Sequence, residues 1–222
     1  MRVLHTWLAG TDGPGKRALP LGEFLHPVPL AALVILAVND HYLKGRHLLP
    51  QWLTGKLSDF GGLLFFPLLL TALGDTVLYF VTRLTGWRFD YSLRRWKVVA
   101  ACVATAAVFT PLELSASYGE LYTKTLGKIG FPSETYADLT DLLALTMLPV
   151  AAWLGWREIR RVPLGRLHAG GGFADVRKLN AGDPRRAAAA EALERSHAAY
   201  VARPDDAAAA ASVSDALATL RE

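Results

Sequence analysis

The sequence predicts an all-α integral membrane protein: a four-helix transmembrane bundle made of two similar helical hairpins, followed by a C-terminal tail that is α-helical or partly disordered. Hydrophobic residues make up 52% of the 222 residues, which is high for a soluble domain of this size. They fall in four long blocks between Phe24 and Trp156, whereas the residues after Arg157 are polar, charged or rich in alanine. We therefore expect one part of the chain in a bilayer and another in water.

Each block is long enough to cross a membrane, because a helix needs about twenty mostly apolar residues to span the roughly 30 Å hydrocarbon core. A soluble helix would show a polar stripe, and the run from Leu63 to Leu70 shows none. The predicted spans cover residues 24–43, 60–82, 98–117 and 137–156. The predicted domains are an N-terminal segment (1–23), the transmembrane domain (24–156), a basic Gly-rich linker (157–182) and an Ala-rich helical tail (183–222).

Lysine and arginine are concentrated on one side of the predicted spans. The N-terminal segment carries three, the loop between the second and third spans five, and the start of the tail four, against three and two in the other loops. Positively charged loops stay in the cytoplasm, so both termini are expected to be cytoplasmic in a plasma (inner) membrane. The N-terminal segment lacks a continuous apolar core, so we expect no cleavable signal peptide.

A short motif recurs at the start of the second helix of each predicted hairpin. Leu57-Ser58-Asp59 precedes Pro67, and Leu139-Thr140-Asp141 precedes Pro149, with the same separation between aspartate and proline. This repeat fits a duplicated two-helix unit whose halves have parallel orientation.

The predicted topology gathers polar and ionisable residues at the extracytoplasmic ends of the spans. Candidates for an ion or ligand pocket are Asn39, Asp40, Lys56, Asp59, Glu113, Asp138 and Asp141. Carboxylates are ligands for divalent cations, and ionisable residues at membrane depth are candidates for function. The alternative is that Ser58 with Asp59, and Thr140 with Asp141, only cap the N-termini of two helices.

One acidic residue lies deeper. Asp75 follows Asp59 by sixteen residues, or roughly 24 Å along a helix, which places it near the inner interface. We expect it either to be bonded within the bundle, or to reach water near Arg83, or to take part in a proton or ion relay.

The two motifs resemble those of an uncharacterised family of bacterial multi-pass membrane proteins. The first is Asn39-Asp40 with Thr54-Gly55-Lys56-Leu57-Ser58-Asp59, and the second is Asp138-Leu139-Thr140-Asp141-Leu142-Leu143-Ala144-Leu145. The resemblance covers about residues 24–156 and implies a membrane location, but no activity, cofactor or substrate. That family carries a proline where Leu139 stands, so the start of the fourth helix is expected to differ here.

The tail combines a flexible connector with two short helices. Gly170-Gly171-Gly172 forms the connector, Asp183-Pro184 begins one helix, and Pro204 begins a second. Alanine favours helix but buries little surface, so such a hairpin would be marginal alone in water. Two interpretations of the tail stay open: a module that binds a protein partner, or a partly ordered low-complexity segment.

The leading functional hypothesis is a bacterial plasma-membrane protein with an extracytoplasmic acidic pocket that binds a divalent cation or a small polar molecule. One alternative is a metal-dependent membrane enzyme acting on a lipid-linked substrate through the carboxylates and His41 or His47. Another is a non-catalytic scaffold. No catalytic residue or cofactor is identified, since no spacing matches a known catalytic motif. The chain has a single cysteine, Cys102, which excludes a disulfide framework. The expected partner is the lipid bilayer, and not nucleic acid.

Overall fold

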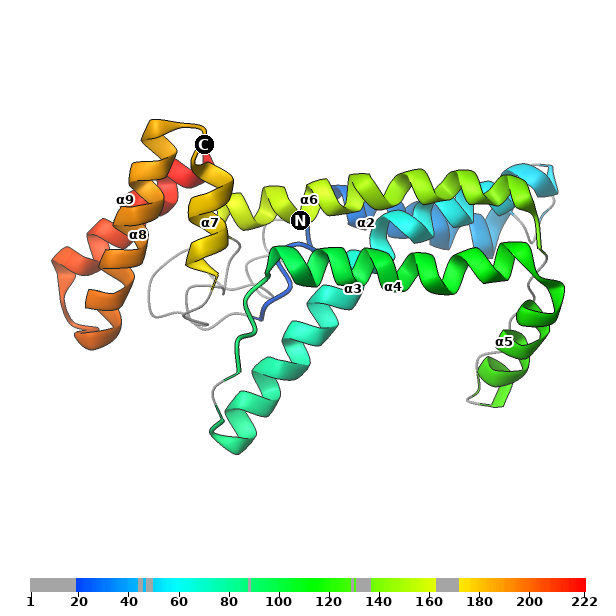
Figure 1. The fold of residues 1–222 in the computed structure, drawn as a ribbon, viewed down its shortest axis with the longest axis horizontal. Helices are drawn as coiled ribbons and strands as arrows, with labels where there is room; N and C mark the ends of the chain where they lie inside the picture. Colours follow the sequence, from blue (N-terminus) through cyan, green and yellow to red (C-terminus); the bar gives the residue numbers. More distant parts are fainter. Residues whose placement is uncertain are drawn as a thin grey trace. The chain divides into compact units, whose positions relative to one another are not determined.

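The computed structural model describes residues 19–43, 46, 50–87, 89–128, 130, 137–162 and 172–222 (Figure 1). These residues form helices and no strand, which confirms the all-α prediction for this part of the chain. In chain order the elements are α2 (Pro27–Val38), the π-helix η1 (Asn39–Leu43), α3 (Gln51–Thr85), α4 (Arg95–Leu114), α5 (Ala116–Lys128), the 3-10 helix η2 (Leu139–Thr146), α6 (Met147–Arg161), α7 (Phe173–Asn180), α8 (Pro184–Ala202) and α9 (Ala207–Arg221).

Three segments are long and apolar enough to cross a membrane. They are Trp52–Thr85, Arg95–Leu114 and Leu139–Arg161, and they match the second, third and fourth predicted spans. The first predicted span is a shorter apolar helix, Pro27–Leu43, which falls below the length of about twenty residues that a full crossing needs. It begins at Pro27 because proline has no backbone N–H to donate within a helix and is therefore accommodated in the first turn, where that N–H would have no partner. A bundle of four spans is therefore not confirmed.

Two helix boundaries differ from the prediction in a way that changes the role of the repeated motif. Helix α3 begins at Gln51, directly after Pro50, so Ser58 and Asp59 lie inside the helix and do not cap its start. In the second motif the N-cap residue of η2 is Asp138, whose carboxylate accepts a hydrogen bond from the N–H of Thr140. The third span ends at Leu114, because the chain leaves the helix at Ser115 before α5 begins.

The described residues divide into two compact units. Unit 2 takes its residues from the ranges Pro27–Pro67 and Val99–Ala152. Its core joins α3, α4, η2 and α6 through the buried side chains Leu63, Cys102, Phe109, Ala144 and Leu148. Helix α2 lies close to α3 at Gly61, where a Cβ atom would be 3.4 Å from the Ala32 carbonyl oxygen.

Unit 1 takes its described residues from the ranges Met1–His26, Leu68–Val98 and Trp153–Glu222. Leu68 of α3, Val98 of α4 and Leu154 of α6 are almost completely buried in its core. Gly155 permits a close approach at this point, since a Cβ atom there would lie 2.9 Å from both methyl carbons of Val98.

The C-terminal part of unit 1 is a helical module of α7, α8 and α9 (Figure 1). Its own core contains Val176 of α7, Leu193 of α8, and Val213, Leu217 and Leu220 of α9. Asp183 caps α8 by accepting hydrogen bonds from the N–H groups of Arg185 and Arg186, as the Asp183-Pro184 pair predicts. The tail is thus helical over residues 172–222, and α7 lies in the stretch predicted as linker.

Candidate functional site

Six of the seven sequence-predicted site residues fall into two groups of unit 2, and the seventh, Asp59, follows Ser58 on α3. The first, which we call the Lys56 cluster, consists of Lys56, Glu113, Asp138, Thr140 and Asp141. The Lys56 ammonium, on α3, lies 2.6 Å from the Asp141 carboxylate and donates a second hydrogen bond of 2.5 Å to the Thr140 hydroxyl, both on η2. This lysine therefore joins the first motif of the repeat to the second.

Helix α4 joins the same cluster through Glu113. The Thr140 hydroxyl, which accepts from Lys56, donates to the Asp138 carboxylate at 2.8 Å. The Glu113 carboxylate accepts from the backbone N–H of Asp138 at 3.1 Å. The hydrogen bonds from the Thr140 N–H and hydroxyl, helped by the positive charge of Lys56, lower the pKa of Asp138 from its ordinary value.

The cluster contains more acidic than basic groups. Asp141 is hydrogen-bonded to Lys56, and Asp138 and Asp59 act on the same ammonium electrostatically. Glu113 is a further carboxyl group beside Asp138. Within the Lys56 cluster, one ammonium thus lies beside the carboxyl groups of Glu113, Asp138 and Asp141, which leaves an excess of oxygen acceptors for a cationic ligand.

The second group, the Asn39 cluster, consists of Asn39, Asp40, Thr54 and Ser58. Asn39 is completely buried, and its side-chain N–H₂ donates to the Thr54 carbonyl at 2.6 Å and to the Ser58 hydroxyl at 2.7 Å. The Ser58 hydroxyl in turn donates to the Asp40 carboxylate at 2.8 Å. The side-chain oxygen of Asn39 is buried and accepts no hydrogen bond from the part of the chain that the structure describes.

The backbone around Asn39 is also unusual. Asn39 and Asp40 begin the π-helix η1, and short π-helical segments are frequent at functional sites. His41, one residue further, is exposed, and His47 lies outside the described residues. Within those residues, no group of three or more histidine, cysteine, aspartate or glutamate side chains is placed to hold a metal ion.

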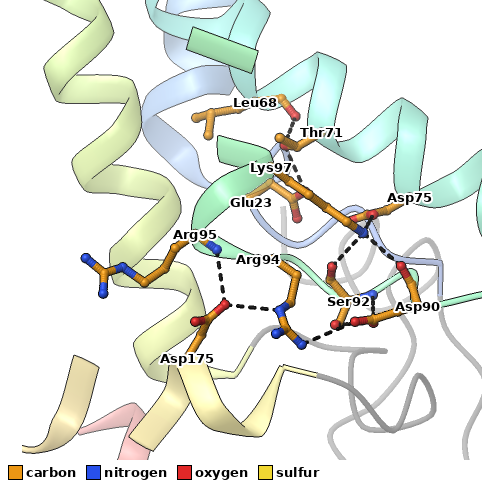
Figure 2. Close-up of polar contacts among 10 residues, drawn as sticks. All are labelled: Glu23, Leu68, Thr71, Asp75, Asp90, Ser92, Arg94, Arg95, Lys97 and Asp175. Carbon is orange, nitrogen blue, oxygen red and sulfur yellow. Dashed lines mark hydrogen bonds and ion pairs between the residues drawn. The ribbon is translucent and has the colours of Figure 1, made fainter. Parts of the chain in front are cut away.

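Asp75 is bonded within unit 1, one of the outcomes expected from the sequence (Figure 2). Its side chain is 1% exposed, and the Lys97 ammonium lies 2.5 Å from its carboxylate. Lys97 also donates to the carbonyl oxygens of Asp90 and Ser92 at 2.8 and 2.9 Å. We call Asp75, Asp90, Ser92 and Lys97 the Lys97 cluster. From the sequence, Lys97 is only one of the five basic residues counted in the loop between the second and third predicted spans. A buried aspartate is stable as an anion when a cation lies beside it, and Lys97 is such a cation near the start of the next span.

The Lys97 cluster continues to the C-terminal module through two arginines (Figure 2). Arg94 pairs with Asp90 at 3.3 Å and with Asp175 of α7 at 3.1 Å. The Asp175 carboxylate also accepts from the backbone N–H of Arg95 at 3.2 Å, so it caps the first turn of α4. The sequence carries no local signal for this contact, because 80 positions separate the two residues.

The module also satisfies carbonyl groups at the end of α6. The Asn180 amide donates to the Arg160 carbonyl at 3.2 Å, and Arg221 donates to the Val162 carbonyl at 3.1 Å. Arg161 donates in return to the Arg221 carbonyl at 2.6 Å. Because the last carbonyls of a helix lack partners within it, these bonds fix the module to α6.

No family model, curated protein or solved structure matches this chain. The resemblance of the two motifs to an uncharacterised bacterial membrane family therefore stays a prediction.

Proposed function

We propose that this chain is a multi-pass protein of a bacterial plasma membrane, with both termini in the cytoplasm, and that its Lys56 cluster binds a small cation or polar ligand on the extracytoplasmic side. The observation that carries the proposal is that Lys56 is the single cationic residue of the Lys56 cluster, which also holds the carboxyl groups of Asp141, Asp138 and Glu113. An excess of carboxyl groups at the end of apolar helices is costly unless a cation compensates it.

The hydrogen bonds of the cluster indicate how a ligand would be bound. Lys56 occupies the cationic position of the cluster, held by Asp141 and Thr140. A small ligand with an ammonium group would replace the Lys56 ammonium with the same hydrogen-bond acceptors. A divalent cation would use the oxygens of Asp138 and Asp141, which are the ligand type that Mg²⁺ and Ca²⁺ prefer, while Lys56 turns away.

The proposed topology has its own test. A Cys102→Ser background carrying one new cysteine at Glu120 or at Asp205, both exposed, allows labelling from one side of the membrane. In sealed inner-membrane vesicles of inverted orientation, a membrane-impermeant maleimide is expected to label the cysteine at position 205 and not the one at position 120. The opposite pattern would contradict the orientation.

Ligand binding is tested by thermal unfolding of the detergent-purified protein with Mg²⁺, Ca²⁺ or ethanolamine at constant ionic strength. A ligand at one hundred times its Kd stabilises a folded protein by about 2.7 kcal/mol, so a saturable rise in Tm is expected from at least one probe. Asp141→Asn keeps the size of the side chain but removes its charge. It should raise the ligand concentration needed for the same rise in Tm at least tenfold.

Glu120→Gln is the matched control, because Glu120 is an exposed acid of α5 that belongs to neither cluster. It should retain the wild-type response. If Asp141→Asn and Glu120→Gln respond to the probes as the wild type does, the Lys56 cluster is not the binding site.

A further inference from the structure

We propose that Arg95 and Arg157, each stacked on a tryptophan of α6, form a site in unit 1 for the headgroup of an anionic phospholipid. This site is separate from the Lys56 cluster: it rests on the proposed membrane location but not on ligand binding by that cluster.

The site consists of two cation–π pairs. The Arg95 guanidinium, from the start of α4, lies over the Trp156 ring at 5.4 Å, and the Arg157 guanidinium lies over the Trp153 ring at 5.7 Å. Trp153 and Arg157 are four residues apart, hence on one face of α6. Stacking on a ring holds each guanidinium in place and leaves its N–H groups available along the edge.

Both tryptophan–arginine pairs lie at the end of candidate membrane spans. Arg95 is the first residue of the span Arg95–Leu114, and Arg157 lies in the last turn but one of Leu139–Arg161. Trp153 is 56% exposed and Trp96, beside Arg95, is 65% exposed. Large aromatic surfaces of this kind favour the headgroup level of a bilayer, where the ring contacts acyl chains and the polar edge contacts headgroups.

Among the described residues, no carboxylate forms a salt bridge with either of the two arginines. Arg94, Arg177 and Arg185 each face a carboxylate, whereas neither Arg95 nor Arg157 does so among the residues that the structure describes. Figure 2 shows the Arg95 side chain directed away from Asp175, which bonds only its backbone N–H. The carboxylate next to Arg157 in sequence, that of Glu158, lies 3.9 Å from His26 and interacts electrostatically with both Arg161 and Arg157, without a salt-bridge contact to Arg157.

These observations indicate which ligand fits the site. A guanidinium recognises phosphate through two parallel hydrogen bonds, and the available charge here is positive. The exposed Trp153 ring gives the same site an apolar surface, which an acyl chain covers and a free phosphate ion does not. The fitting partner is therefore a lipid with a net negative headgroup, such as phosphatidylglycerol.

The test is a titration of the full chain in a neutral detergent with short-chain phosphatidylglycerol, with phosphatidylcholine and with inorganic phosphate, followed by Tm. Each juxtamembrane basic residue contributes about 1 kcal/mol to binding an anionic surface, or roughly fivefold in affinity, so the double variant Arg95→Gln/Arg157→Gln should bind phosphatidylglycerol about 25-fold more weakly. Arg177→Gln/Arg185→Gln removes the same charge from exposed positions of the C-terminal module and should behave as the wild type.

A second measurement needs no variant of the arginines. Brominated phosphatidylglycerol should quench tryptophan fluorescence more than brominated phosphatidylcholine at equal mole fraction, and Trp153→Phe should reduce this difference. Equal response to the two lipids, an unchanged response in the Arg95→Gln/Arg157→Gln variant, or a rise in Tm with phosphate equal to that with phosphatidylglycerol would each overturn the proposal.

Discussion

Replacing Lys97 with methionine is expected to destabilise the protein by about 3–5 kcal/mol, because the substitution removes one partner of a buried ion pair, the ammonium that lies 2.5 Å from the Asp75 carboxylate. Asp75 is 1% exposed and the Lys97 side chain 12%, so water reaches the carboxylate poorly. Lys97 uses its three N–H groups on Asp75 and on the carbonyls of Asp90 and Ser92, which methionine cannot replace.

The double variant Asp75→Leu/Lys97→Met separates the destabilisation caused by removing only the lysine from the net contribution of the Asp75–Lys97 ion pair to stability. Replacing both partners of a buried ion pair by apolar residues is often neutral or stabilising, although the two carbonyl groups then lose a donor at roughly 1–3 kcal/mol each if they stay dry. Since the Asp90 carbonyl contact is solvent-exposed, we expect the double variant to be at least 2 kcal/mol more stable than Lys97→Met.

The assay is reversible unfolding by sodium dodecyl sulfate in mixed micelles, followed by far-ultraviolet circular dichroism. Lys124→Met is the control, because Lys124 is exposed on α5 and its loss should change the unfolding free energy by less than about 0.5 kcal/mol. A Lys97→Met effect as small as that of the control would refute the reasoning. So would a double variant less stable than Lys97→Met.

Gly155→Ala should destabilise by about 1–3 kcal/mol in the same assay, because the added methyl group would meet both methyls of Val98 at 2.9 Å; Val98→Ala should restore part of the loss, and Gly74→Ala, with no atom within 4 Å of its Cβ position, should cause none. Asp175→Ala should cost about 0.5–2 kcal/mol and speed amide exchange in the first turn of α4, whereas Asp175→Asn, which keeps a capping oxygen, should protect that turn better. The lowered pKa of Asp138 means that its ionised form stabilises the fold: the Tm difference between wild type and Asp138→Ala should be full above pH 3.8 and should decrease as the pH falls below it, and a difference that grows on acidification would contradict this sign.

Hydropathy alone predicts the second, third and fourth spans, because a segment that must bury its backbone in lipid needs both length and apolar side chains. It does not predict that α3 begins at Gln51, since Lys56 and Ser58 are polar residues that nevertheless fit a helix when their side chains bond to neighbouring elements. The first span is shorter than predicted because Pro27 starts α2.

The candidate site was predicted as a set of residues but not as an arrangement. The structure brings together Lys56, Asp138 and Asp141, and separately Asn39 with Asp40. Two features could not be read from the sequence: the π-helix at Asn39 and the 3-10 segment at Leu139, both of which depend on tertiary contacts more than on residue type. The contact of Asp175 with α4 likewise follows from tertiary packing and has no local pattern.

The distance in sequence between α4 and Asp175 has a consequence for biosynthesis. A ribosome that adds about 5–20 residues per second completes Asp175 roughly 4–16 s after Arg95, from which it is separated by 80 positions. During that interval the Arg95 N–H at the start of α4 lacks the Asp175 carboxylate as its acceptor. The start of α4 is therefore capped only after the C-terminal module has been synthesised, and nascent chains arrested before residue 175 should show faster hydrogen exchange at Arg95 than the complete chain.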